Sequence, residues 1–231
     1  DSKLVVCGNC HVSAQAQWDS TAHAGAWNTL QASPGAQAFC EGCHTVSDLG
    51  NAVSEPAGHS ATGEERYYDV QCESCHGAGL AHVEDPNKNT VPLAMMNVGD
   101  VLGDAGTGCA ECHTGDHHPF AEEWAASGHG TVNAYPAGRD GCENCHTGEG
   151  ALDMFGVQTN YTEKADLGED GQHMAITCAV CHDPHGSDNG AQLRFPIDAP
   201  SEELNLCIQC HQKRGRPDPT TFRGPHSPEG P

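Results

Sequence analysis

Seven pairs of cysteines, each followed directly by a histidine, are the residues of this chain best suited to chemistry. They form the pattern C-x-x-C-H and use all 14 cysteines. The copies begin at Cys7, Cys40, Cys72, Cys109, Cys142, Cys178 and Cys207. A single C-x-x-C pair could be half of a zinc site, a redox dithiol or a ligand pair of an iron–sulfur cluster. A histidine after every pair instead indicates attachment sites of c-type haem.

Each motif can supply two thioether bonds and one iron ligand, because positions i, i+3 and i+4 share a face of a helical turn. The predicted thioether cysteines are Cys7, Cys10, Cys40, Cys43, Cys72, Cys75, Cys109, Cys112, Cys142, Cys145, Cys178, Cys181, Cys207 and Cys210. The predicted proximal iron ligands are His11, His44, His76, His113, His146, His182 and His211. The sequence therefore predicts seven covalently attached haem c groups and no catalytic residue.

Nine further histidines could supply the second, distal ligand of each iron. They are His23, His59, His82, His117, His118, His129, His173, His185 and His226. His185 follows the proximal His182 by three residues, so it lies on the same side of that haem and cannot reach the opposite face. We expect His185 to ligate a different, closely packed haem, and His82 to do the same in the first half of the chain.

The simplest interpretation of a lone histidine is a surface residue or a hydrogen-bonded core residue. Six of the nine histidines instead form repeat-related pairs: His23 with His129, His59 with His173, and His82 with His185. We expect these six to be iron ligands. The choice among His117, His118 and His226 stays open, and Met95, Met96, Met154 and Met174 are less favoured because histidines already outnumber the irons.

An internal repeat organises these motifs. Cys7 and Cys109 are 102 residues apart, as are Cys40 and Cys142. "QWDSTAHAG" and "EWAASGHG" also recur, at a spacing of 106 residues between Trp18 and Trp124. The sequence predicts a three-haem half over residues 1–103, a second over 104–200, and a seventh haem with an extended basic tail over 201–231, all in one compact unit.

Short helices should position the ligands. A helix is predicted over residues 14–30, with Ser13 as a possible cap, and a counterpart over 119–127 that begins at Pro119 and carries Glu122 and Glu123 in its first turn. Ser201 is expected to cap a third helix that runs through His211. Only residues 66–70 and 154–161 are predicted as strands, and the chain from Arg214 onward is predicted to be extended.

The composition agrees with a fold built around cofactors. The hydrophobic fraction is 36% and aromatic residues make up only 5%, which is little for a conventional core in 231 residues. We expect a mostly irregular multihaem cytochrome c fold with short α-helices and very little β-structure, organised around a stacked array of seven haems.

The formal charge of −22 argues against nucleic acid or anionic lipid as partners. No segment approaches the roughly 18 apolar residues that a membrane-spanning helix needs. Because haem c is attached outside the cytoplasm, we expect the mature form of an exported precursor, located at the cell surface or secreted.

Two histidines on every iron would leave no open position for a substrate. A C-x-x-C-K motif, which would mark an unusual proximal ligand, is absent from the sequence. Seven haems on so short a chain would also lie nearly in contact. We therefore interpret the chain as an electron conduit. A multihaem reductase of the nitrite, hydroxylamine or tetrathionate type remains a minor alternative.

The strings "CESCHGAGLAHV" and "CHDPHGS" resemble those of multihaem c-type cytochromes of anaerobic respiration. The density of haem motifs and "CEGCHTV" are similar to the extracellular cytochrome filaments, or nanowires, of metal-reducing microbes. The resemblance implies stacked haems and a histidine from one subunit that completes a haem in the next. It also implies copies of the chain itself, redox-partner cytochromes or extracellular acceptors as partners.

The C-terminal tail suggests how such a polymer could form. His226 lies in "RGPHSPEG", and four of the ten basic residues lie within 11 positions of each other, while the rest of the chain is acidic. The four are Lys213, Arg214, Arg216 and Arg223. A head-to-tail electrostatic match of this kind produces open fibres. A monomeric periplasmic or extracellular shuttle, whose basic residues pair with its own haem propionates, is the alternative.

Overall fold

Short helices joined by irregular segments make up the fold. The computed structural model describes residues 7–51, 58–94, 98, 108–157, 173–198 and 204–211. The α-helices are α1 Val12–Trp18, α2 Ala26–Ala32, α3 Gly58–Thr62, α4 Cys72–His76, α5 Leu80–Glu84, α6 Phe120–Ala125, α7 Ala134–Ala137, α8 Glu143–His146, α9 Gly148–Met154, α10 Cys178–Cys181 and α11 Leu206–Cys210. The 3-10 turns are η2 Cys7–Asn9, η3 His23–Gly25, η4 Ala38–His44, η5 Glu65–Tyr67, η6 Cys109–Glu111, η7 Gly128–Gly130 and η8 Gly190–Gln192.

The described part of the chain contains two isolated β-bridges and no strand, which confirms the predicted short helices and irregular segments with very little β-structure. The prediction of a strand over residues 66–70 was wrong. Arg66 and Tyr67 belong to η5, and of these residues only Tyr68 forms a β-bridge, which is antiparallel and isolated, with Thr45. Residues 154–157 form the end of α9 and an irregular segment, and residues 158–161 lie outside the described part.

The single helix predicted over residues 14–30 is wrong. Helix α1 ends at Trp18, and α2 begins only at Ala26. The hydroxyls of Ser20 and Thr21 donate to the carbonyls of Gln17 and Trp18 at 2.7 Å, and such side-chain bonds compete with continuation of a helix. His11, rather than Ser13, occupies the N-cap of α1.

Of the other two predicted helices, the start of α6 was predicted correctly and the cap of α11 was not located. Helix α6 has Pro119 at its N-cap and Glu122 in its first turn, as predicted. The hydroxyl of Thr114 and the N–H of Gly115 donate to the Glu122 carboxylate, and these bonds lower its pKa. Helix α11 is capped by Asn205, whose Oδ1 accepts from the N–H of Cys207 at 2.9 Å, whereas Ser201 and the basic tail lie outside the described residues.

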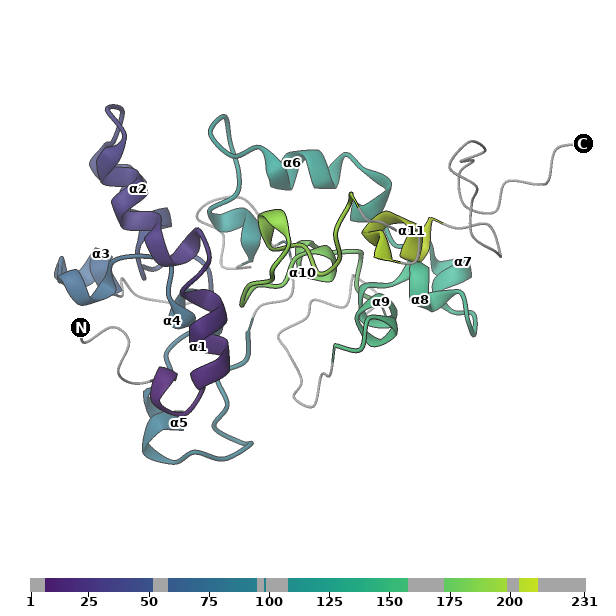
Figure 1. Cartoon of the computed structure of the whole chain (residues 1–231), viewed down its shortest axis with the longest axis horizontal. Helices are drawn as coiled ribbons and strands as arrows, with labels where there is room; N and C mark the ends of the chain where they lie inside the picture. The colour runs from purple at the N-terminus through teal and green to yellow at the C-terminus, as the bar shows by residue number, and fades with distance from the viewer. Residues whose placement is uncertain are drawn as a thin grey trace, which may run out of the picture.

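The elements of the first and second halves of the sequence follow one another along the long axis of the molecule. In Figure 1, α1 to α5 occupy the left side and α7, α8, α9 and α11 the right, with α10 between them. None of the helices in the described ranges is long and apolar enough to cross a membrane.

Hydrogen bonds recur at the spacing of the sequence repeat. The Trp18 indole N–H donates to the carbonyl of Val70 at 2.9 Å, and the Trp124 indole donates to Ile176 at 2.7 Å. Both donors and both acceptors are 106 residues apart. The division into halves stays a prediction, but these equivalent bonds favour it.

Replacing Trp18 or Trp124 should lower the stability of the protein by a similar amount. Trp18→Phe and Trp124→Phe each leave a carbonyl without its indole donor, so we expect each to lower the free energy of unfolding by about 1–2 kcal/mol. Thermal unfolding of the haem-loaded protein measures this, with Trp27→Phe as the control because its ring stacks on Tyr68 at 3.8 Å and phenylalanine can still stack. An effect at only one of the two positions would argue against equivalent roles.

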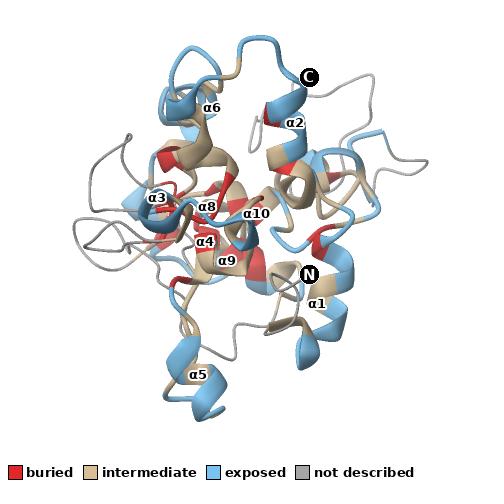
Figure 2. Cartoon of the chain, turned by 90° about the vertical axis from the view of Figure 1, so that its left-hand side faces the viewer, coloured by how far each residue is buried: buried red, intermediate tan, exposed pale blue. Residues whose placement is uncertain are grey.

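The apolar core is small. Its main cluster contains Ala151, Leu152, Met174 and Val180, with Phe155, Val157 and Ile176 packed against it. Figure 2 shows buried positions gathered around α8, α9 and α10, while α5 and much of α6 are exposed. The packed cluster of the described residues therefore lies in the second half of the sequence.

Candidate haem sites

The C-x-x-C-H motifs form helical turns, as their spacing predicted. We number them 1 to 7 in chain order, beginning with residues 7–11 as motif 1 and ending with residues 207–211 as motif 7. In motifs 1, 4, 6 and 7 the histidine N–H donates to the carbonyl of the first cysteine at 2.8–2.9 Å. This turn places both thiols and the imidazole where one porphyrin could engage all three.

Backbone carbonyls orient several motif histidines. The Nδ1 of His44 lies 2.8 Å from the Ala26 carbonyl, that of His76 lies 2.9 Å from the Pro92 carbonyl, and that of His182 lies 2.7 Å from the Ala191 carbonyl. A carbonyl can only accept, so Nδ1 carries the proton and the lone pair of Nε2 is available. This is the usual second-shell arrangement of a metal-binding histidine.

His113 of motif 4 differs from these three. Its Nδ1 is buried without a hydrogen-bond partner in the described part of the chain. Burial lowers its pKa to about 4, with further contributions from His23, His118 and His182. The ring is therefore neutral at pH 7, which is the form that binds iron.

Four motif histidines face a second imidazole at a nearly constant separation. The ring centroids are 6.3 Å apart for His11 and His82, 6.1 Å for His113 and His23, 6.2 Å for His76 and His185, and 5.9 Å for His211 and His129. Two imidazoles on opposite sides of one metal ion should lie about 6 Å apart, because each metal–nitrogen bond is about 2 Å and each nitrogen lies about 1 Å from its ring centre. The four pairs thus have the spacing of axial ligands.

Four of the six repeat-related candidates belong to these pairs, and the other two do not. The ring centroid of His59 lies 5.5 Å from those of Trp27 and Tyr68. Its Nδ1 is 3.7 Å from Oε2 of Glu41. The Nδ1 of His173 donates to Glu149 at 2.9 Å. His173 lines a cavity of about 390 Å³ together with residues of α8, α9 and the loop before α8.

The remaining candidates have mixed positions. The ring centroids of His117 and His118 are 4.2 Å apart. The ring centroid of His118 is 5.7 Å from that of His113, which lies five residues earlier in the same segment. Met174 is buried in the core cluster and Met154 ends α9, whereas Met95, Met96 and His226 lie outside the described residues.

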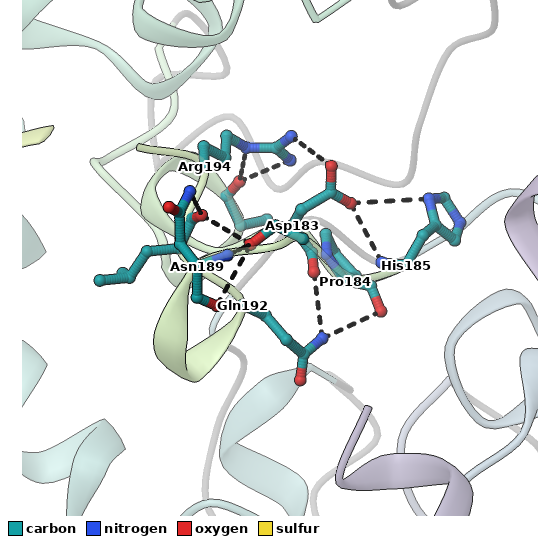
Figure 3. Close-up of polar contacts among 9 residues, drawn as sticks. Asp183, Pro184, His185, Asn189, Gln192 and Arg194 are labelled. Atoms are coloured by element: carbon teal, nitrogen blue, oxygen red, sulfur yellow. Dashed lines mark hydrogen bonds and ion pairs between the residues drawn. The ribbon is translucent and has the colours of Figure 1, made fainter. Parts of the chain in front are cut away.

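The loop that carries His185 is held by a polar network (Figure 3). Arg194, whose side chain is only 12% exposed, donates to Asp183 at 3.1 Å and twice to the Ala179 carbonyl at 3.0 Å. Asp183 in turn accepts from the N–H of His185 at 3.1 Å, and Gln192 donates to the Asp183 carbonyl at 3.0 Å. The network fixes the direction in which His185 leaves motif 6.

Gly186 explains how this loop reaches the first half of the chain. It has a φ of +122°, and a Cβ added there would lie 2.6 Å from the Gln17 carbonyl of α1. The absence of a side chain allows the loop to pack against α1, and His185 then faces His76 of α4. The sequence predicted that His185 ligates a haem other than that of motif 6. It could not identify which motif carries that haem, because packing between distant segments leaves no pattern in the spacing of residues.

Gly186→Ala should therefore separate His185 from His76. We expect a loss of stability of about 1–3 kcal/mol from the strained backbone and the clash, together with a high-spin signal from one iron in the EPR spectrum. Gly190→Ala is the matched control, because a Cβ there meets nothing within 4 Å. An unchanged low-spin spectrum in Gly186→Ala would show that this packing does not position His185.

Large apolar side chains beside the motifs are exposed to solvent. Val12 is 65% exposed next to His11, Phe39 is 83% exposed next to Cys40, and Phe120 is 54% exposed with its ring 5.9 Å from His113. An apolar macrocycle held by the adjacent motif would cover such side chains. The turns, the ring spacing and these surfaces all fit haem c.

Comparison with known proteins gives two family matches. The family described as "Cytochrome c554 and c-prime" matches residues 6–77, and the family "Doubled CXXCH motif" matches residues 172–216. The first range contains motifs 1 to 3 and the second contains motifs 6 and 7. No solved structure matched the chain with significance.

Two curated relatives are similar over most of the chain. The multiheme cytochrome MtrA of Shewanella baltica is 26% identical over 63% of this chain and 44% of its own length. The C-type polyheme cytochrome OmcB of Geobacter sulfurreducens is 26% identical over 74% of this chain and 24% of its own length. The chain thus spans less than half the length of either relative. Because the family matches cover motifs 1 to 3, 6 and 7, and the turns and opposed imidazoles of the described residues fit haem, the chain is a multihaem c-type cytochrome.

Proposed function

We propose that this cytochrome binds seven haem c groups and carries electrons through them. The observation that supports this most strongly is the set of four opposed imidazole pairs at 5.9–6.3 Å. Each pair joins a motif histidine to one of the histidines outside the motifs. Histidines that hold an iron from both sides would leave it no open position for a substrate, and the haem would then supply electron transfer alone.

The ligand assignment follows from these pairs. The motif cysteines form the thioether bonds, and the motif histidines are the proximal ligands. His82, His185, His23 and His129 are the distal ligands of motifs 1, 3, 4 and 7. Motifs 2, 5 and 6 take their distal ligands from His59, His117, His118, His173 and His226.

Spectroscopy and haem analysis test this proposal together. Intact mass should show seven haems per chain, and the EPR spectrum of the oxidised protein should be dominated by low-spin iron. Chemical reduction should convert all the haems, and carbon monoxide should bind to none of them. A large high-spin fraction with turnover of nitrite, hydroxylamine or tetrathionate would support the reductase alternative and reject the conduit.

A head-to-tail polymer outside the cell is a second proposal. His76 of motif 3 faces His185, which lies in the second half of the sequence. If a second copy of the chain bound next to this second half, one of its histidines could face His182 of motif 6 as His185 faces His76. The basic residues of the tail and the acidic remainder of the chain favour such a contact. Electron microscopy of the native protein should show fibres with a regular repeat, and His226→Ala should shorten them. Discrete single-chain particles would instead support the shuttle.

A further inference from the structure

The carboxylate of Glu149 holds His173 through a charged hydrogen bond. Its Oε1 accepts from the Nδ1–H of His173 at 2.9 Å, and its Oε2 accepts from the N–H of Met174 at 2.8 Å. A carboxylate can only accept in these bonds, so the imidazole proton lies on Nδ1 and the lone pair of Nε2 is left for a metal. Glu149 therefore fixes both the direction and the tautomer of this candidate distal ligand.

Close backbone packing keeps Glu149 against His173. The N–H of Gly148 donates to the carbonyl of Met174 at 2.7 Å. A Cβ at Gly148 would lie 2.3 Å from the carbonyl oxygen of Ala175, so a side chain there would push the start of α9 away from this segment. Met174 belongs to the buried core cluster. The Glu149–His173 pair is thus anchored on packed structure.

The other oriented histidines have neutral partners. Three motif histidines are bonded to backbone carbonyls, and the Nδ1 of His82 lies 3.2 Å from the hydroxyl oxygen of Thr90. A hydrogen bond to an ionised acceptor is roughly twice as strong as one between neutral groups. It draws the Nδ1 proton further from the ring and makes Nε2 a more basic ligand. His173 is therefore expected to donate more electron density to an iron than these four histidines.

The first half of the chain differs at the equivalent places. The position 102 residues before Glu149 is Ser47, whose hydroxyl donates to a backbone carbonyl at 2.7 Å. His59 is the repeat counterpart of His173, and its Nδ1 is 3.7 Å from Oε2 of Glu41, which is beyond hydrogen-bond distance. The side chain of Glu41 is 36% exposed and that of Glu149 is 42% exposed. The two carboxylates are similarly solvated, so the hydrogen bond is what distinguishes the second half.

The surroundings of the Glu149–His173 pair are also acidic. Asp140 and Glu143 line the same cavity of about 390 Å³ as the pair. Arg139 lines it too, but its guanidinium donates to the hydroxyl of Tyr135 at 2.8 Å. Negative charges near a metal stabilise the more positive of its two oxidation states. The charges around the cavity therefore act in the same direction as the hydrogen bond of Glu149.

We propose that Glu149 is a positioning residue that lowers the reduction potential of the haem ligated by His173, so that this haem is the last of the array to be reduced. The inference rests on the proposed function, because it takes His173 as a distal ligand, and it adds a residue that sets the potential of one haem. A more strongly donating imidazole stabilises the oxidised iron. Electrons that enter the protein then occupy the other haems first.

Potentiometric titration of the haem-loaded Glu149→Gln variant, followed by visible and EPR spectra, tests the inference. The equilibrium of the last reduction step should shift tenfold or more toward the reduced form, which is about 59 mV for one electron. The g values of one low-spin haem should change as well. Glu149→Asp keeps the charge but is one methylene shorter, so it should shift the same step. Unchanged potentials and g values in Glu149→Gln, or wild-type values in Glu149→Asp, would overturn the inference.

Glu41→Gln is the matched control, because it removes a similarly exposed carboxylate beside His59 without breaking a hydrogen bond of that imidazole. It should leave all g values unchanged, and a change equal to that of Glu149→Gln would show that charge alone sets the potential and would contradict the role of the bond. If Glu149→Gln does not load its haems, EPR spectra of the wild-type protein at successive potentials decide. The haem reduced last should then be the one that becomes high-spin in His173→Ala.

His173→Ala separates this inference from the proposed function. One haem should become high-spin in this variant. A fully low-spin spectrum would remove His173 from the ligands and reject the role of Glu149, while bis-histidine haems completed by the other candidates would stand. Predominantly high-spin iron in the wild-type protein would instead reject the proposed function itself.

Discussion

His185→Ala is expected to convert one of the seven proposed low-spin haems into a high-spin haem that binds carbon monoxide. The ring centroids of His185 and His76 lie 6.2 Å apart, with the two rings nearly parallel. Removing the ring of His185 leaves the iron of motif 3 with one protein ligand. The potential of that haem should rise, because axial ligands set haem potentials.

EPR spectroscopy and carbon monoxide difference spectra measure this effect. Asp188→Ala is the matched control, since Asp188 is an exposed residue on the same loop and should leave all haems low-spin. His82→Ala should affect one other haem, that of motif 1, and the double variant should show two high-spin haems because the two irons are distinct. A His185→Ala protein that stays fully low-spin would remove His185 from the ligand assignment.

Preventing haem attachment should abolish the fold. Thirteen hydrophobic residues are buried in the described part of the chain, and five of them are alanine. So small a core cannot offset the conformational entropy of a chain of this length. The bound haems must therefore supply much of the stabilisation, as metals do in small metalloproteins.

Expression without haem attachment machinery, compared with the loaded protein, measures this dependence. The unloaded chain should show no cooperative thermal transition and little protection from hydrogen exchange, whereas the loaded protein should unfold cooperatively. The matched control is loaded protein whose haems have been chemically reduced, which changes the charge of the irons but not the packing. A cooperative transition in the unloaded chain would mean that the side chains form a sufficient core by themselves.

The sequence predicted the local chemistry well and the long-range pairing poorly. The C-x-x-C-H spacing predicts a helical turn, and local spacing is enough to determine it. Helix α6 could be placed because Pro119 and Glu122 are local signals. The break between α1 and α2 was missed because the hydrogen bonds of Ser20 and Thr21 and the distant bond of Trp18 to Val70 outweigh the helical periodicity.

The partners of the distal histidines show the same limit. The spacing from His182 predicted a haem other than its own for His185, but the position of His185 opposite His76 depends on Gly186 packing against α1. The largely covered Arg194 and its bonds to Asp183 and Ala179 were also missed, because an arginine near a motif is usually a surface residue. Contacts between residues so far apart leave no periodic signal in one sequence.

The histidine pairs that cross the chain also set an order for its assembly. His76 pairs with His185, which follows it by 109 residues, and His113 pairs with His23, which precedes it by 90 residues. His76 of motif 3 therefore meets its partner only after the later segment with His185 has been synthesised, whereas His113 of motif 4 emerges when His23 is already present. If these rings hold haem iron from both sides, the two pairs would join the first half of the chain to the second only after both halves have been synthesised.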